Sequence, residues 1–162
     1  EALECFLPEL IIVADAMEQS MVILRPLLDK LSLATGSSGT VVIATLQGDI
    51  HDIGRNIFTV MLKASGFAVY DLGHDVKPDV IISKAEELNA DVIGLSSLLT
   101  TSLPFSKDLI NLLKAQNLRD KYKVVMGGGA VTPEYVEKIG ADGFSGDAAN
   151  GVRLVRRVIS EK

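Results

Sequence analysis

The chain has 162 residues, of which 48% are apolar, with one cysteine and a formal net charge of −5. This length suits one domain that buries a core without disulfides or a structural metal, and the lone thiol of Cys5 favours a reducing, cytoplasmic setting. The acidic balance argues against nucleic acid as a partner, and the apolar runs fall far short of the ~20 residues that span a membrane.

Residues 1–33 show a helical pattern. Leucines, methionines and alanines recur there every three or four residues, which is the spacing of one apolar helix face. Pro8 and Pro26 indicate that this segment is not one unbroken rod, so we expect two helices that meet near residues 18–20. The small and polar residues 34–39 follow and form the one candidate linker.

From residue 40 onward, short β-branched runs alternate with longer amphipathic segments, which is typical of βα units around a parallel sheet. The predicted strands are Val41–Leu46, Phe67–Asp71, Asp91–Leu95, Lys123–Met126 and Gly143–Ser145. The predicted helices are Ile53–Ala64, Pro78–Leu88, Ser102–Gln116, Thr132–Ile139 and Ala148–Ile159. We therefore expect a flavodoxin-like, Rossmann-type α/β fold with five parallel strands in the order 2-1-3-4-5.

In that strand order, ligands bind outside the carboxyl ends of the first and third strands. The loop after the first strand covers residues 47–56 and the loop after the third covers residues 96–102, and both are rich in polar groups. The loop after the fourth strand contains Gly127, Gly128 and Gly129, whose backbone no side chain covers. These loops are the candidate binding site.

Asp49 and His51 are the candidate metal-binding pair in the first loop. A turn could bring the carboxylate onto one imidazole nitrogen of His51 and leave the other nitrogen free to ligate a metal. One histidine is too few for a zinc site, so a metal bound here must arrive with most of its coordination filled. In the other interpretation, Asp52 caps the following helix, Gly54 eases its start, and His51 is a solvated loop residue.

Three segments follow the first, third and fourth predicted strands in turn: Gly48-Asp49-Ile50-His51-Asp52-Ile53-Gly54, Ser96-Ser97-Leu98 and Gly127-Gly128. They resemble the motifs D-x-H-x-x-G, S-x-L and G-G of the corrinoid (vitamin B12)-binding domains. These domains occur in methionine synthase, in the corrinoid proteins of methyltransferase systems and in some mutases. The resemblance covers nearly the whole chain.

The resemblance implies that the cofactor is cobalamin or a related corrinoid, bound with its own base removed from cobalt. His51 would be the lower axial ligand, because a macrocycle with four equatorial nitrogens needs only one protein ligand. Asp49 would accept a hydrogen bond from the other imidazole nitrogen, with Ser102 completing the relay. The other cofactor-binding residues that the resemblance implies are Gly48, Ile50, Asp52, Ile53, Gly54 and Leu98 in the motifs, and Ser96, Thr100, Gly127, Gly128, Gly129, Phe144 and Asp147 along the buried nucleotide tail.

Three functions fit these loops. The first is a methyl carrier, which receives a methyl group on cobalt from a substrate-specific methyltransferase and passes it to a second methyltransferase with a tetrahydrofolate or thiol acceptor. The second is the small subunit of an adenosylcobalamin-dependent mutase. The third is a flavodoxin-like binding or signalling module without a corrin, but a flavodoxin would need a hydroxyl-rich loop where residues 48–54 contain no serine or threonine.

The N-terminal helices favour the methyl carrier. Residues 5–10 and the helix ending at Leu31 resemble the last part of the helical cap of methyl carriers, whereas small mutase subunits typically begin near the first strand. The resemblance implies that Phe6 covers the methyl face and that residues 34–39 are a hinge. It also implies that the chain alone turns over no substrate, because both reactions belong to its partners.

The resemblance divides the chain into a partial helical cap (1–33), a linker (34–39) and a corrinoid-binding α/β domain (40–162). The family's cap normally has four helices, and only about two fit in the first segment. The chain also begins with Glu1 in place of a methionine. We therefore expect that upstream residues are missing or that a partner covers the apolar helix face.

Overall fold

The structure is a computed structural model that describes residues 38–161 and part of the N-terminal segment. The described residues of that segment are 12, 13, 16, 19, 20, 22, 23, 24, 26 and 27, and they are helical and exposed. In the part of the chain that the structure describes, no helix is long and apolar enough to cross a membrane.

Most of the predicted helical cap lies outside the described residues. Gln19 and Ser20 are helical, so the predicted break near residues 18–20 is wrong at these two positions. The position of Phe6 and residues 34–37 of the predicted linker lie outside the described residues. The division of the chain at residues 33 and 39 therefore stays a prediction.

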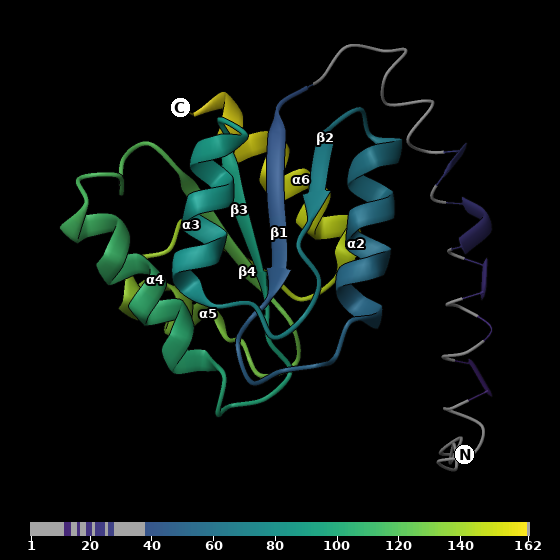
Figure 1. Ribbon diagram of the computed structural model, residues 1–162, viewed down its shortest axis with the longest axis horizontal. Coiled ribbons are helices and arrows are strands. Elements are labelled where there is room, and N and C mark those ends of the chain that lie inside the picture. Colours follow the sequence, from purple (N-terminus) through teal and green to yellow (C-terminus); the bar gives the residue numbers. More distant parts are fainter. Residues whose placement is uncertain are drawn as a thin grey trace.

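Five strands form one parallel sheet, which confirms the predicted fold class (Figure 1). They are β1 (Thr40–Thr45), β2 (Ala68–Asp71), β3 (Val92–Ser96), β4 (Lys123–Gly127) and β5 (Gly143–Ser145). Their order is β2-β1-β3-β4-β5, as predicted. The central strands consist mainly of buried apolar residues because both faces of the sheet are covered.

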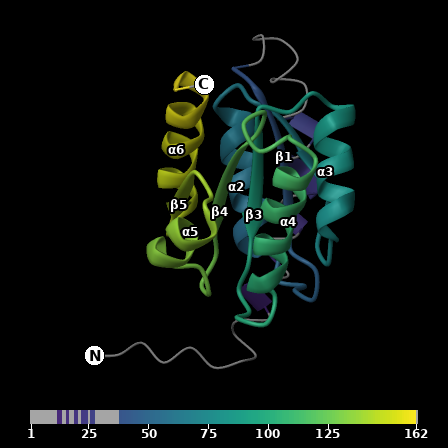
Figure 2. The ribbon, with the colours of Figure 1, turned by 90° about the vertical axis from the view of Figure 1, so that its left-hand side faces the viewer.

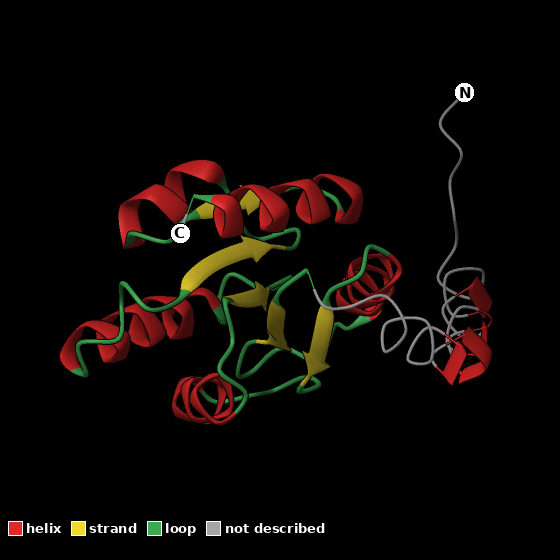
Figure 3. Cartoon of the chain, turned by 90° about the horizontal axis from the view of Figure 1, so that it is seen from above, coloured by secondary structure: helices red, strands yellow, loops and turns green. Residues whose placement is uncertain are grey.

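Helices cover the two faces unequally. α2 (Ile53–Ala64) and α6 (Ala148–Ser160) pack on one face, and the other face carries α3 (Pro78–Glu87), α4 (Leu103–Ala115) and α5 (Pro133–Ile139). Figure 2 shows α6 on the opposite side of the sheet from α3 and α4, and Figure 3 shows the twisted sheet between these layers. Each of these strands and helices agrees with its predicted range to within one residue at each end.

The alternation of side chains along each strand builds two apolar cores. Val124 and Met126 of β4 enter the larger core with Leu109 of α4, whereas Val125 points to the other face and packs with Val155 of α6. These side chains are almost completely buried. The two cores fix the strands in their register.

The carboxyl ends of the strands meet at one edge of the sheet, which is the lower edge in Figure 1. The parallel register pairs Thr45 with Ser96 and Ser96 with Gly127, so the ends of β1, β3 and β4 lie side by side. Ser145 of β5 pairs with Gly127 from the other side. The loops that carry the three sequence motifs therefore leave the sheet next to one another.

Candidate functional site

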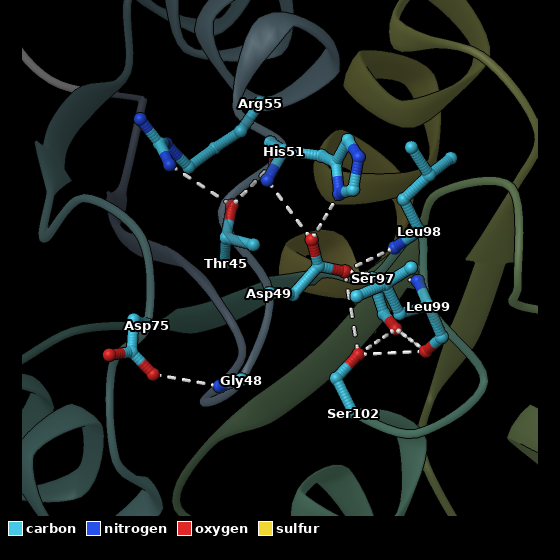
Figure 4. Close-up of polar contacts among 10 residues, drawn as sticks. All are labelled: Thr45, Gly48, Asp49, His51, Arg55, Asp75, Ser97, Leu98, Leu99 and Ser102. Carbon is cyan, nitrogen blue, oxygen red and sulfur yellow. Dashed lines mark hydrogen bonds and ion pairs between the residues drawn. The ribbon is translucent and has the colours of Figure 1, made fainter.

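Asp49 is the centre of the site at this edge. Its side chain is fully buried in the loop between β1 and α2, and its two carboxylate oxygens face two different loops (Figure 4). Oδ1 accepts hydrogen bonds from the main-chain N–H of His51 at 3.0 Å and from Nδ1 of the same residue at 2.7 Å. Oδ2 accepts from the main-chain N–H groups of Leu98 at 2.6 Å and Leu99 at 3.1 Å.

The surroundings of Asp49 favour its ionised form. Burial by itself raises the pKa of a carboxyl group, because it removes water from the charge. Main-chain N–H groups of His51, Leu98 and Leu99, together with the imidazole, outweigh the burial and lower the pKa of Asp49 from 3.8 to about 2. Asp49 is therefore a carboxylate throughout the physiological range.

An ionised Asp49 determines which nitrogen of His51 carries hydrogen. A carboxylate can only accept a hydrogen bond, so Nδ1 of His51 must donate. In the neutral ring the lone pair then lies on Nε2, and none of the described residues hydrogen-bonds to that nitrogen. Because 48% of the His51 side chain is exposed, Nε2 is available to an incoming metal.

Two serines of the β3–α4 loop complete the contacts of the carboxylate. Ser102, the residue before α4, donates to Asp49 Oδ2 at 3.4 Å, and its hydroxyl lies 2.7 Å from that of Ser97. Both hydroxyl groups also lie within hydrogen-bond distance of the main-chain oxygen of Leu99, and both side chains are fully buried. The structure thus brings Ser102 to Asp49, and it adds Ser97, the middle residue of the S-x-L motif, which the sequence analysis did not include among the binding residues.

A buried arginine, Arg55, is connected to the main chain of His51 through Thr45. Arg55 of α2 donates from Nη1 to Thr45 Oγ1 at 3.0 Å, and its Nε forms a 2.9 Å ion pair with Asp71 Oδ1. Thr45 Oγ1 in turn donates to the main-chain oxygen of His51 at 3.2 Å. Sequence reasoning missed this group, although Arg55 shares a buried helix face with Thr59 and Leu62, where a charge requires a partner.

The loop after β2 is hydrogen-bonded to the loop between β1 and α2. Asp75 accepts a hydrogen bond from the Gly48 N–H at 2.7 Å and donates its own N–H to the Asp49 carbonyl at 3.0 Å. Asp75 and Gly48 both have positive φ, at 54° and 80°, in the left-handed region that few residues other than glycine, asparagine and aspartate adopt. Sequence reasoning missed Asp75, and no motif marks it.

A cavity of about 150 Å³ opens beside these loops, between the sheet edge and the first turns of α2 and α6. The predicted site residues that line it are Gly54, Ser96, Gly127, Gly128 and Asp147. A Cβ atom at Gly54 would have no protein atom within 4 Å. The cavity therefore has room at the position where α2 begins.

Gly128 is needed for the approach of two loops. Its φ is +112°, and a Cβ atom there would lie 2.1 Å from the main-chain oxygen of Ser97. Gly127 is similarly close to the Ser145 oxygen, at 2.9 Å. The resemblance implied that these glycines make room for a nucleotide tail, and the structure adds that they allow the backbones around the cavity to pack.

The other predicted residues lie around the site or farther away. Ile50, Ile53 and Leu98 are aliphatic side chains that are exposed by 70%, 46% and 48%. Gly129 lies under Leu98, Thr100 is exposed in a turn, and neither of them lines the cavity.

Two further predicted residues contribute mainly to local structure. Phe144 is part-buried against the larger core and does not line the cavity. Asp147 caps α6 by accepting the Asn150 N–H at 2.8 Å, and this contact lowers its pKa.

The side chain of Asp52 makes no capping hydrogen bond to α2, so the interpretation of Asp52 as a helix cap is wrong. Its Oδ2 lies 3.6 Å from Nη2 of Arg55.

The donor set limits what kind of metal the site can hold. Among the described residues, no group of three or more histidine, cysteine, aspartate and glutamate side chains is placed to bind a metal ion. His51 offers one nitrogen, and the glycine-lined cavity opens nearby. This arrangement suits a metal that arrives inside an organic macrocycle, and it does not suit a free zinc ion.

Comparison with known proteins gives a consistent result. The family model of the B12 binding domain matches residues 39–156. A dimethylamine corrinoid protein of Methanosarcina mazei is 43% identical over 155 residues, which are 96% of this chain and 92% of that protein. The structure of the Methanosarcina barkeri monomethylamine corrinoid protein superposes with a TM-score of 0.82 at 35% identity, covering 97% of this chain and 74% of that one. The methanol:cobalamin methyltransferase complex of the same organism matches with a TM-score of 0.73 at 30% identity, over 98% of this chain and 59% of that one.

Proposed function

This chain belongs to the B12-binding domain family, among the corrinoid proteins of methyltransferase systems, and we propose that it carries a methyl group on cobalt between two partner methyltransferases. Its cofactor is cobalamin or a related corrinoid. The observation that carries the proposal is the Asp49–His51 pair, which leaves one half-exposed imidazole nitrogen at the ligand-binding edge of the sheet.

His51 is the proposed lower axial ligand of the cobalt. A bound corrinoid would supply a cobalt ion for the transfer of a methyl group between the two partners. Asp49 holds the Nδ1 proton and so keeps the Nε2 lone pair directed outward. Because five hydrogen-bond donors surround Asp49, we infer that it remains ionised and keeps His51 in the tautomer that carries hydrogen on Nδ1.

The cavity is the proposed site of the nucleotide tail. Gly54 leaves open space at the start of α2, while Ser96 and Asp147 offer polar groups on two sides. Ile50, Ile53 and Leu98 would offer a bound macrocycle an apolar surface and exclude water from the imidazole. Binding would then cover three aliphatic side chains that are otherwise exposed.

The proposed partners are a substrate-specific methyltransferase and a second methyltransferase with a tetrahydrofolate or thiol acceptor. The support is the set of relatives, whose names refer to dimethylamine, monomethylamine and methanol. We infer a small methylated compound as the original methyl donor. On this proposal the chain turns over no substrate alone, since no general acid, base or nucleophile is needed in a carrier.

Reconstitution tests the carrier function. The chain incubated with hydroxocobalamin should turn red or orange and retain about one corrinoid per chain after gel filtration. Partners captured from native extract should then transfer methyl groups from one of a panel of methanol, methylamines and aryl methyl ethers. A chain that stays colourless would contradict corrinoid binding, and a loaded chain that no methyltransferase methylates would contradict the carrier role.

A further inference from the structure

The backbone of His51 is held at both ends, and the second contact is not part of any motif. Asp49 accepts the His51 N–H, and Thr45 donates to the His51 carbonyl oxygen at 3.2 Å (Figure 4). Arg55 donates to Thr45 at 3.0 Å. Building on the proposed role of His51, we propose that Thr45 and Arg55 are positioning residues, which hold the axial histidine through its main-chain carbonyl.

The direction of these hydrogen bonds follows from the groups involved. A guanidinium group can only donate, so the Thr45 hydroxyl accepts from Arg55 and has its single hydrogen left for the His51 carbonyl. The donor is a cation, and a charged donor polarises the hydroxyl and strengthens the bond that the hydroxyl makes in turn. Thr45 is fully buried and Arg55 is 5% exposed, so water competes little with either bond.

Arg55 is itself fixed by the neighbouring strand. Asp71, the last residue of β2, forms the ion pair with Arg55 Nε and also accepts the Gly73 N–H at 2.9 Å. The Thr59 hydroxyl donates to its second oxygen at 3.3 Å. A continuous series of polar contacts therefore runs from the end of β2 through α2 to the His51 carbonyl.

This arrangement fits a positioning role better than a purely structural one. A buried ion pair contributes little to stability compared with apolar side chains of the same volume. His51 lies in a loop, outside the ladders of the sheet and the first turn of α2, so neither its N–H nor its carbonyl is satisfied by regular structure. With both groups fixed, only the two side-chain torsions of His51 remain, and Asp49 holds the ring.

Thr45 is the residue at which to test the inference. Arg55 lines the cavity, so its replacement would disturb the proposed tail site as well, whereas Thr45 does not line it. Thr45→Val keeps the shape and removes the hydroxyl, and Thr45→Ser restores the hydroxyl. Ser106→Ala is the matched control, because Ser106 is a buried hydroxyl on α4 whose hydrogen bonds go to Leu103 and Tyr135 and not to the residues that hold His51.

Two readouts are measured on the 162-residue chain. Hydrogen exchange of the His51 amide in the corrinoid-free chain reports how often the loop around His51 opens. In Thr45→Val the loop loses the buried hydrogen bond to the His51 carbonyl, so the exchange should accelerate about five- to tenfold. In the cobalamin-loaded chain, electron paramagnetic resonance of cobalt(II) gives the ratio of nitrogen-ligated to unligated cobalt, which should fall by a similar factor. Thr45→Ser and Ser106→Ala should match the wild type in both readouts.

The outcomes separate this inference from the proposed function. Unchanged exchange and unchanged ligation in Thr45→Val, beside a nitrogen-ligated wild type, would overturn the positioning role alone. An equal loss in Thr45→Val and Ser106→Ala would also overturn it, because the effect would then come from general loosening. A wild-type chain whose cobalt lacks an axial nitrogen would instead overturn the proposed role of His51.

Discussion

Two aspartates at opposite edges of the sheet, Asp49 and Asp142, are held by similar contacts. Asp142 precedes β5 at the amino edge, where it accepts the Val124 N–H at 2.7 Å and a hydrogen bond from Arg119 Nη2 at 2.7 Å. Arg119 also donates to the main-chain oxygens of Tyr122 at 2.9 Å and Gly140 at 2.7 Å. At this edge, every one of these hydrogen bonds joins two groups of the protein and so stabilises the fold.

At the carboxyl edge, the same kind of carboxylate has a different partner. Asp49 is bonded to an imidazole, and the second nitrogen of that ring is bonded to none of the described residues. A guanidinium group has no lone pair to offer a metal, whereas His51 has one. An aspartate with several hydrogen bonds is thus no sign of a site by itself, and the identity of its partner decides whether a ligand can bind.

The largest expected effect comes from the close approach of loops at the carboxyl edge. Gly128→Ala places a Cβ atom 2.1 Å from the Ser97 oxygen, so we expect it to cost at least about 3 kcal/mol in the free energy of unfolding. Gly73→Ala is the matched control, because Gly73 also has positive φ but a Cβ atom there would have no protein atom within 4 Å, and it should cost about 1 kcal/mol. Urea unfolding measures both, and equal costs would show that the close approach is not a constraint.

Removal of Asp142 tests the claim that the amino edge serves only stability. Asp142→Ala leaves the Val124 N–H without its acceptor and removes the ion pair of Arg119, so we expect a loss of about 2–3 kcal/mol in the free energy of unfolding. The corrinoid affinity of the folded fraction should not change, and the exposed Asp120→Ala should change neither quantity. A weaker corrinoid affinity in folded Asp142→Ala would break the contrast between the two edges.

The pH dependence of stability tests the ionisation of Asp49. Its pKa is lowered from 3.8 in the unfolded chain to about 2 in the folded chain, so its charge stabilises the fold above pH ~4. That contribution, about 2 kcal/mol, is lost as the pH falls from ~4 toward ~2. The difference in unfolding free energy between wild type and Asp49→Asn should therefore shrink in this interval, and a difference that stays constant down to pH ~2 would contradict it.

The smallest expected effect on stability is that of His51→Ala. The His51 side chain is 48% exposed and Asp49 keeps its main-chain donors, so the free energy of unfolding, measured by thermal unfolding, should fall by about 0.5 kcal/mol or less. Corrinoid binding through the tail should largely persist, while the absorption spectrum of the cobalt should change. A large loss of stability would mean that His51 serves the fold, as Asp142 does.

Much of this site could be predicted from the sequence because the motifs follow strands. Alternating βα patterns predict a parallel sheet, and the common strand order of such sheets, which the structure confirms, brings the loops after β1, β3 and β4 to one edge. The two-residue spacing of Asp49 and His51 then allows their contact through a turn. The placement of Ser102 beside Asp49 agrees with the relay that the family resemblance implied.

The remaining contacts could not be predicted, because they depend on how side chains meet across elements. Thr45 and Arg55 lie on different elements, and a threonine at the end of a strand carries no signal of its own. Gly128 is required because the main chain of Ser97 lies too close for a side chain. The hydrogen bonds of Asp75 to residues 48 and 49 depend on a positive φ, which the sequence around an aspartate does not reveal. Such contacts follow from tertiary geometry and not from spacing along the chain.

One measurement tests the proposed axial ligation most directly. Electron paramagnetic resonance of cobalt(II) cobalamin bound to the chain shows the splitting from its axial nitrogen, and labelling the protein with ¹⁵N-histidine changes that splitting only if the ligand is a histidine. The chain has two histidines, so His74→Ala should keep the ¹⁵N doublet and His51→Ala should lose it. A triplet that persists in the labelled wild type would show that the corrinoid's own base stays on cobalt and would contradict the role of His51.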